Sequence, residues 1–230
     1  MGGQLGDVLG ASWSPVNVLL VLGLVGGVIL SAGTAVYAVT TGALKLARIA
    51  AGILVVSSAA YMAVLLTVSL RSEEVVLPRG ETKHFCGFFL DCHMGVGVAG
   101  VAQARSVGTG PDRRSATGVY YFVTLNVASN ARRETLSLYR PDVHVVTDDA
   151  RRFGRDQKAE GYLGGDTSLT RPVAAGSSYP VTLVFDLPAD ARNPRLLVTQ
   201  GDERLLDRLP ELLMVGDEKS LLHKKTTLAL

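Results

Sequence analysis

Two long apolar runs near the start of the chain dominate its pattern of hydrophobic and polar positions. They cover Val18–Val39 and Ile49–Leu70, and neither contains a charged residue. Each run would form a helix about 33 Å long, enough to cross a bilayer core of about 30 Å. A buried helix of a soluble protein is the alternative, but two such runs in succession, neither with a polar stripe, argue against it. The pattern therefore predicts two transmembrane helices that form a hairpin over residues 18–70.

Small residues recur at steps of four in the first run, and the second helix carries alanines at steps compatible with one face. Such stripes let two membrane helices approach closely. We expect the two helices to pack against each other, while a seam for homo-oligomerisation stays open as the alternative. The expected helix-packing residues are Gly23, Gly27, Ser31 and Ala35 in the first run, answered by Ala47, Ala51, Ala59 and Ala63 in the second.

Charges around the two runs predict the topology. The N-terminal segment 1–17 contains no Lys or Arg, and Trp13 lies where an interfacial tryptophan is expected, whereas the link carries Lys45 and Arg48. The positive-inside rule then puts the link in the cytoplasm and both termini outside, although basic residues at 71, 79 and 83 argue the other way. Arg outnumbers Lys, a composition typical of GC-rich bacteria, so we expect a two-pass protein of a bacterial inner or plasma membrane.

After a polar stem at 71–83, residues 84–230 show short alternating stretches separated by turn residues, which predicts an all-β sandwich. In the strongest strand, Gly118–Ala128, Leu125 lies on the face that begins at Val119, and in a later strand Phe185 points inward. The alternation slips at Gly100–Val101, which indicates a β-bulge. Other expected strands are Met94–Ala104, Asp142–Thr147, Tyr179–Leu187 and Arg195–Thr199, and the tail Thr226–Leu230 is expected to pack on the domain.

The β domain also resembles a known family. Asn130 at a strand end, the Asp148-Asp149 turn, the Gly176-Ser177 turn and the strand Phe185–Pro188 follow one another in a familiar order. They look like the bacterial immunoglobulin-like extracellular domains named after the telomeric-repeat-binding factor, to which the mycobacterial secreted immunoprotective antigen is similar in fold. The resemblance covers about 80 residues. It implies an Ig-like sandwich on an envelope protein and brings no catalytic residue with it.

One constellation could carry chemistry, the stretch HFCGFFLDCH at 84–93. Its spacing excludes haem attachment and is poor for zinc or copper, although His84, Cys86, Cys92 and His93 remain possible metal ligands. A disulfide between Cys86 and Cys92 in an oxidising compartment is the favoured interpretation, and two free thiols are a further alternative. The aromatic pair inside the loop is a possible partner surface: Phe88 and Phe89.

The remaining charges point to a solvated surface. Four aspartates, at 142, 148, 149 and 156, could bind calcium but lack the spacing of a calcium loop. A formal charge of +2 gives no field for nucleic acid. We therefore expect a non-enzymatic membrane protein without cofactor that presents an extracytoplasmic Ig-like domain to an unknown protein partner. The alternatives are a metal- or redox-active envelope domain using the 84–93 loop, and an accessory subunit of a membrane complex acting through its helix hairpin.

Overall fold

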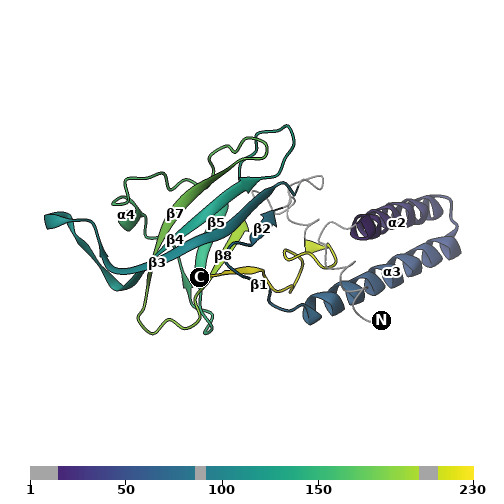
Figure 1. Ribbon diagram of the computed structural model, residues 1–230. Helices are drawn as coiled ribbons and strands as arrows, with labels where there is room; N and C mark the ends of the chain where they lie inside the picture. The colour runs from purple at the N-terminus through teal and green to yellow at the C-terminus, as the bar shows by residue number, and fades with distance from the viewer. Residues whose placement is uncertain (1–14, 86–91, 202–211) are drawn as a thin grey trace, which may run out of the picture. The chain divides into compact units, whose positions relative to one another are not determined.

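Figure 1 shows the computed structural model of the chain, which describes residues 15–85, 92–201 and 212–230. The chain divides into two compact units. The first contains residues 1–73 together with 203–225, and the second contains residues 74–202 together with 226–230. The β unit thus begins ten residues earlier than the sequence pattern indicates (74 against 84), and one late segment of the chain belongs with the helices.

The helical unit is built from two long helices, α2 (Pro15–Thr40) and α3 (Leu44–Arg71). Pro15 stands at the start of α2, where a missing backbone N–H costs nothing. Residues 41–43 join the helices, and Gly42 adopts a left-handed φ of 74° that favours glycine. The predicted helix hairpin is confirmed. Both helices extend a few residues beyond the apolar runs.

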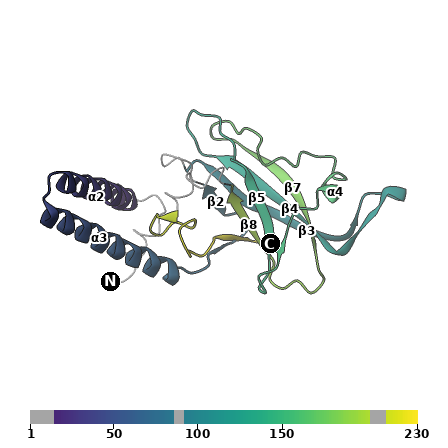
Figure 2. The same cartoon turned by 180° about the vertical axis from the view of Figure 1, so that it is seen from behind.

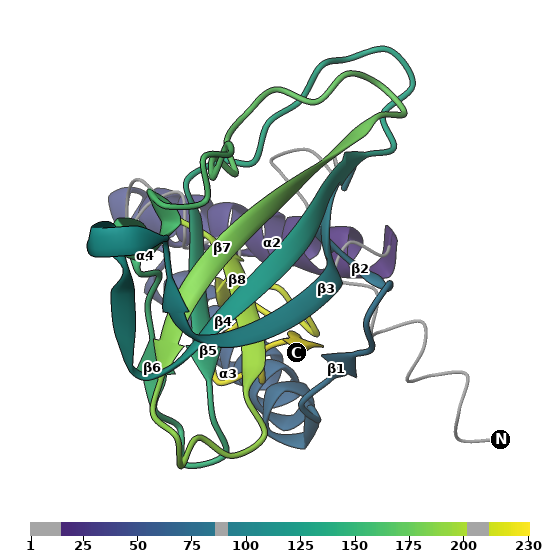
Figure 3. The same ribbon diagram turned by 60° about the vertical axis from the view of Figure 1, so that its left-hand side comes forward.

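The first sheet of the β unit contains four antiparallel strands in the order β2–β3–β4–β7, as Figure 3 shows for its three longest members. β3 and β4 run side by side, with a register shift between Val98 and Gly100. This shift confirms the predicted bulge. The strands are β2 (Thr82–Phe85), β3 (Met94–Val107), β4 (Arg114–Ser129) and β7 (Ser178–Leu187), with a 3-10 turn η1 (Gly110–Asp112) between β3 and β4.

The second sheet has five strands in the order β1–β9–β8–β5–β6, of which Figure 2 labels β5 and β8. β1 and β9 pair in parallel, with Val76 opposite Thr227, so the chain's last strand closes beside its first. The tail therefore packs on the domain as predicted. The strands are β1 (Val76–Leu77), β5 (Pro141–Val146), β6 (Arg152–Phe153), β8 (Arg195–Gln200) and β9 (Thr227–Ala229).

The core lies between the two sheets and follows the predicted strand phases. Leu125 of β4 and Phe185 of β7 are fully buried, as are Val145 and Leu196 of the other sheet. Leu125 and Phe185 are not on opposite sheets, since β4 and β7 are hydrogen-bonded neighbours. Two sheets enclosing one apolar core make the unit a β-sandwich, and the predicted fold class, a helix hairpin followed by an all-β sandwich, is confirmed.

A second, smaller cluster covers the outer face of the first sheet. Tyr120 of β4, assigned by the pattern to the outward face, is fully buried with Val107, Ala159 and Val184. Ala159 lies in the single-turn helix α4 (Gln157–Glu160). The polar stretch 150–178 therefore folds back over the sheet, and both faces of β4 are covered at this point.

Lys83 was assigned to the polar stem but is buried in the sandwich. Only 4% of the residue is exposed. Its ammonium group donates to the carbonyl oxygens of Val198 and Thr226, at 2.9 and 3.1 Å, and lies 5.4 Å from the centre of the Phe85 ring. Because Val198 belongs to the other sheet, Lys83 links the two layers. A buried charge is tolerated here because carbonyl oxygens and an aromatic face replace water.

Candidate functional site

The outer surface of the two helices is apolar along most of its length. Leu30 in α2 is 73% exposed, and Val56 in α3 is 69% exposed. The described residues contain two helices long and apolar enough to cross a membrane. Water would penalise so many exposed aliphatic side chains, whereas lipid tails would not. This surface is therefore suited to a bilayer.

The contact between α2 and α3 uses only part of the predicted small-residue stripes. Ala38 and Ala50 are buried, and Ser31 and Ala35 are half-buried. A Cβ atom at Gly23 or Gly27 would meet no atom of the described residues within 4 Å, so these glycines do not lie in the contact.

The geometry of the helix explains this difference. A strict step of four residues drifts around a helix by about 40° each time, because a turn takes about 3.6 residues. Over three steps, from Ala35 back to Gly23, the drift reaches about 120°. The same drift affects the alanines expected in the contact on the α3 side. Ala47 is half-buried, but Ala51, Ala59 and Ala63 are exposed.

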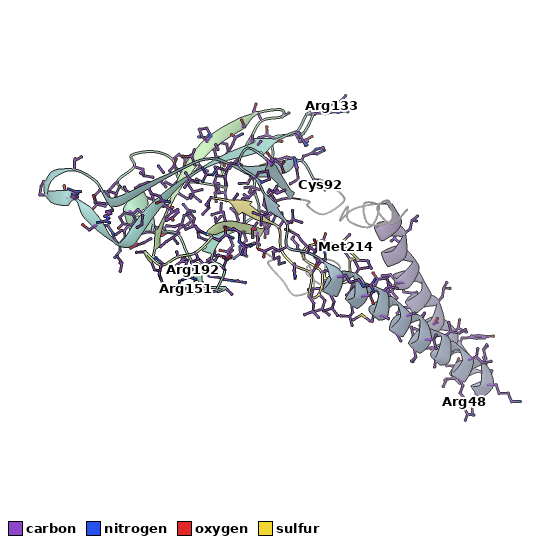
Figure 4. All side chains as sticks on the ribbon, turned by 60° about the horizontal axis from the view of Figure 1, so that its bottom comes forward. Arg48, Cys92, Arg133, Arg151, Arg192 and Met214 are labelled. Atoms are coloured by element: carbon purple, nitrogen blue, oxygen red, sulfur yellow. The ribbon has the colours of Figure 1, made fainter. Side chains whose placement is uncertain are left out.

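A segment from the far end of the chain packs on the last turns of α3. The Tyr61 hydroxyl donates to the carbonyl oxygen of Leu213 at 2.5 Å, and the hydroxyls of Ser69 and Ser220 lie 3.2 Å apart. Tyr61, Leu65 and Ser69 are spaced by four residues and form one stripe, in which Leu65 and Ser69 are buried. Figure 4 shows Met214 beside this part of α3, far from Arg48 near the start of the helix. We refer to residues 212–225 as the α3-bound segment.

The predicted cysteine loop is only partly described. Phe85 at the end of β2 pairs with Met94 at the start of β3. His84 is exposed on β2, and His93 Nδ1 lies 2.6 Å from the side-chain oxygen of Asn130. Cys92 is described (Figure 4), whereas Cys86 and the possible partner surface, Phe88 and Phe89, lie outside the described residues.

Metal binding finds no support in the described part of the chain. No group of three His, Cys, Asp or Glu side chains in residues 15–85, 92–201 and 212–230 could hold an ion. The acidic residues considered for calcium are instead engaged with basic neighbours or with backbone. Asp148 lies 3.2 Å from Arg195, and Asp149 pairs with Arg151.

Two further aspartates follow the same rule. Asp142 faces His144 at 3.3 Å, and Asp156 caps α4 by accepting from the backbone N–H of Ala159 while facing Arg114. The Thr147 hydroxyl, followed by Arg151, lowers the pKa of the Asp149 carboxyl. The acidic set thus belongs to turns and a helix cap in which the carboxylates face arginine or histidine side chains, as expected for a solvated surface.

The sequence pattern missed one buried ion pair. The Glu160 side chain is only 3% exposed and is held by Arg155 through two contacts, Nε–Oε1 at 3.0 Å and Nη2–Oε2 at 2.7 Å. Glu160 Oε1 also accepts the backbone N–H of Val184 in β7 at 3.1 Å. A hollow of about 330 Å³ adjoins the pair and is lined mainly by glycine and polar residues of the 155–167 stretch. No sequence signal marked it, because Arg and Glu five residues apart in a polar loop form no known motif.

Comparisons with known proteins give a fold-level likeness. No family profile and no curated protein matches the chain. Among solved structures, the secreted protein MPT63 of Mycobacterium tuberculosis is 13% identical, with a TM-score of 0.41, and the match covers 56% of this chain and 92% of that one. The yjhA protein of Bacillus subtilis is 10% identical, with a TM-score of 0.42, covering 67% of this chain and 99% of that one.

An uncharacterized β-sandwich protein of Clostridium difficile 630 is 10% identical, with a TM-score of 0.37, covering 70% of this chain and 97% of that one. Likeness of this degree carries no argument about function. The expected resemblance to a secreted mycobacterial antigen is matched at the level of a β-sandwich, and membership of the Ig-like family stays a prediction. The fold assignment rests on the strand order and the core described above.

Proposed function

We propose that this chain is a membrane-anchored protein of a bacterial envelope that presents an extracytoplasmic Ig-like sandwich for contacts with another protein. The exposed apolar surface of α2 and α3 carries this proposal, because lipid tails accommodate such a surface along the described parts of both helices, whereas water penalises it. The sandwich has its own buried core within residues 74–202 and 226–230, as a separately presented domain requires.

The non-catalytic part of the proposal rests on how the charged residues are used. Among the described residues, the acidic side chains considered for chemistry are engaged with arginines, histidine or backbone N–H groups. Such pairing fixes turns and caps. We therefore assign these groups a structural role and place the function in contacts made by the domain.

A disulfide between Cys86 and Cys92 is part of the same proposal. Cys86 follows Phe85 directly in the chain, and Cys92 comes two residues before Met94, while Phe85 and Met94 are paired across β2 and β3. A bond at this place would close the β2–β3 connection. It would also fit an extracytoplasmic, oxidising location.

Topology is tested with two single-cysteine additions in intact cells. Ser115 is exposed near the start of β4, and Ala43 is exposed between the two helices. Ser115→Cys is expected to react with a membrane-impermeant maleimide once any outer membrane is permeabilised, and Ala43→Cys only after lysis. The parent chain gives the background from its own cysteines. The opposite labelling pattern contradicts the orientation, and labelling of both sites before lysis contradicts membrane insertion.

A second candidate function is an accessory subunit that acts through the hairpin. Gly23 and Gly27 favour it, because they point away from α3 and leave an open, narrow strip on α2. Small residues on a lipid-facing strip allow another helix to approach closely. That helix would belong either to a second copy of this chain or to a different membrane protein.

A further inference from the structure

We infer that the α3-bound segment, residues 212–225, is a membrane-interface element that inserts Leu221 and Leu222 among the lipid headgroups and binds an anionic headgroup through Lys224. The inference rests on the proposed membrane insertion of α2 and α3. It adds a second lipid contact, made by a part of the chain that lies between β8 and β9 and shows no membrane signature in the sequence.

The length of α3 sets the depth of this segment. From Arg48 to Ser69 the helix rises about 31 Å, which matches one bilayer core of about 30 Å. With Arg48 at one boundary, Ser69 lies at the other, and Tyr61 lies about 12 Å closer to the bilayer centre. The contact of Ser69 with Ser220 therefore places the later part of the segment at the boundary, whereas the contact of Tyr61 with Leu213 places its first residues about 12 Å deeper.

The backbone of the segment is equipped for a poorly hydrated place. Irregular backbone at membrane depth needs internal partners for its polar groups. The N–H of Leu221 donates to Leu212 at 3.1 Å, and the N–H of Ser220 donates to Asp217 at 2.9 Å. The N–H of Lys224 donates to the hydroxyl of Ser72 at 3.0 Å. Together with the Tyr61 hydroxyl on Leu213, these bonds bridge both ends of the segment.

The buried side of the segment gives the same indication. Met214, Val215 and Asp217 are at most 5% exposed. Burial raises the pKa of the Asp217 carboxyl, which favours its neutral form. The N–H of Lys219 donates to this carboxyl at 2.7 Å. A carboxyl that is easily neutralised is tolerated next to lipid far better than a fixed charge.

The outward side presents two leucines and a lysine. Leu221 and Leu222 are 40% and 61% exposed, and Leu222 has a φ of 64°, a left-handed conformation that is strained for a residue other than glycine. Lys224 is exposed two residues later, and Arg71 is exposed at the end of α3. Apolar side chains beside cations are the arrangement of peptides that lie in the interface between lipid tails and headgroups.

A fluorescence-depth experiment on the full-length chain tests the inference. Leu222→Cys is labelled with an environment-sensitive fluorophore and reconstituted into phosphatidylcholine vesicles with and without phosphatidylglycerol. The vesicles also contain lipids with a doxyl quencher on the acyl chain. A doxyl group near the headgroup is expected to quench this label more than one near the acyl-chain end, and the emission of the label is expected to shift to the blue. Val56→Cys, which points outward from the middle of α3, is the membrane control, and Ser115→Cys on the sandwich is the aqueous control.

The controls separate the two levels of the argument. If Val56→Cys is quenched while Leu222→Cys behaves like Ser115→Cys, the helices span the bilayer and the interface inference is wrong. If Val56→Cys is not quenched either, the proposed membrane anchor fails with it. Phosphatidylglycerol is expected to increase quenching of the Leu222 label, and Lys224→Glu is expected to remove that increase. An increase that persists in Lys224→Glu overturns the headgroup assignment.

Discussion

Replacing Glu160 by Ala is expected to destabilise the β-sandwich far more than an ordinary surface substitution. The change leaves the Arg155 guanidinium without its carboxylate and removes the acceptor of the Val184 N–H. Breaking a buried ion pair by removing one partner costs roughly 3–5 kcal/mol, and an unsatisfied buried N–H costs about 1–3 kcal/mol. Arg155 is 24% exposed and regains some water, so a total of about 3 kcal/mol is the better expectation.

The assay is urea unfolding of the fragment from Glu74 to Leu230, followed by circular dichroism. This fragment contains every residue of the sandwich unit. With a slope of about 2 kcal/mol per molar urea, a loss of about 3 kcal/mol moves the midpoint down by roughly 1.5 M. Glu160→Gln keeps an oxygen for the Val184 N–H and should lose less. Glu81→Ala, an exposed carboxylate next to β2, is the matched control and should change stability by less than about 0.5 kcal/mol.

Two results would refute the reasoning. If Glu160→Ala shifts the midpoint no more than Glu81→Ala, the ion pair contributes nothing to the fold. If Glu160→Gln is as damaging as Glu160→Ala, the Val184 hydrogen bond has no separate role. Replacing both partners, with Arg155→Met added to Glu160→Leu, should recover part of the loss, because no buried charge is then left unpaired.

Two further predictions concern the cysteines and the hairpin. Intact mass of the non-reduced, alkylated protein should show Cys86 and Cys92 joined by a disulfide. Reducing this bond should lower the free energy of unfolding by about 2–3 kcal/mol, because the closed loop is short. Two alkylated thiols would favour a cytosolic domain instead. Gly27→Leu should leave the α2–α3 contact intact, since its Cβ direction is open. If another helix docks on this strip, the same variant should reduce oligomerisation or co-purification in mild detergent, whereas unchanged assembly would count against the accessory-subunit function.

The sandwich could be predicted from the sequence wherever one strand face is buried and the other is not. The alternation of Val181, Leu183 and Phe185 in β7 fixed which side chains point inward, because side chains alternate along a strand. The bulge at Gly100 was visible as a break in the same period. The pattern placed Tyr120 on the second, partly covered face of β4, but alternation carries no information about which segment covers that face, and a distant polar stretch buries Tyr120 completely.

The helical unit shows where local patterns stop being sufficient. The apolar runs predicted the helices, but a step of four residues could not locate their contact face, because the face rotates away from that step. The α3-bound segment was unpredictable for another reason. The segment's residues that contact Tyr61 and Ser69 lie about 150 residues away from them in the sequence. Nothing in a short stretch such as Met214–Ser220 indicates which helix it will cover.

The path of the chain has a consequence for proteolytic shedding. The polypeptide passes between the helical and β units three times, near residues 73, 202 and 225. Cleavage at either of the last two places leaves the sandwich covalently joined to α3. Cleavage between α3 and β1 breaks that covalent connection, yet the α3-bound segment still belongs to the released piece and keeps its contacts with Tyr61 and Ser69. A single cut by a protease is therefore expected to leave the sandwich attached to the helical unit, either through the chain or through these contacts.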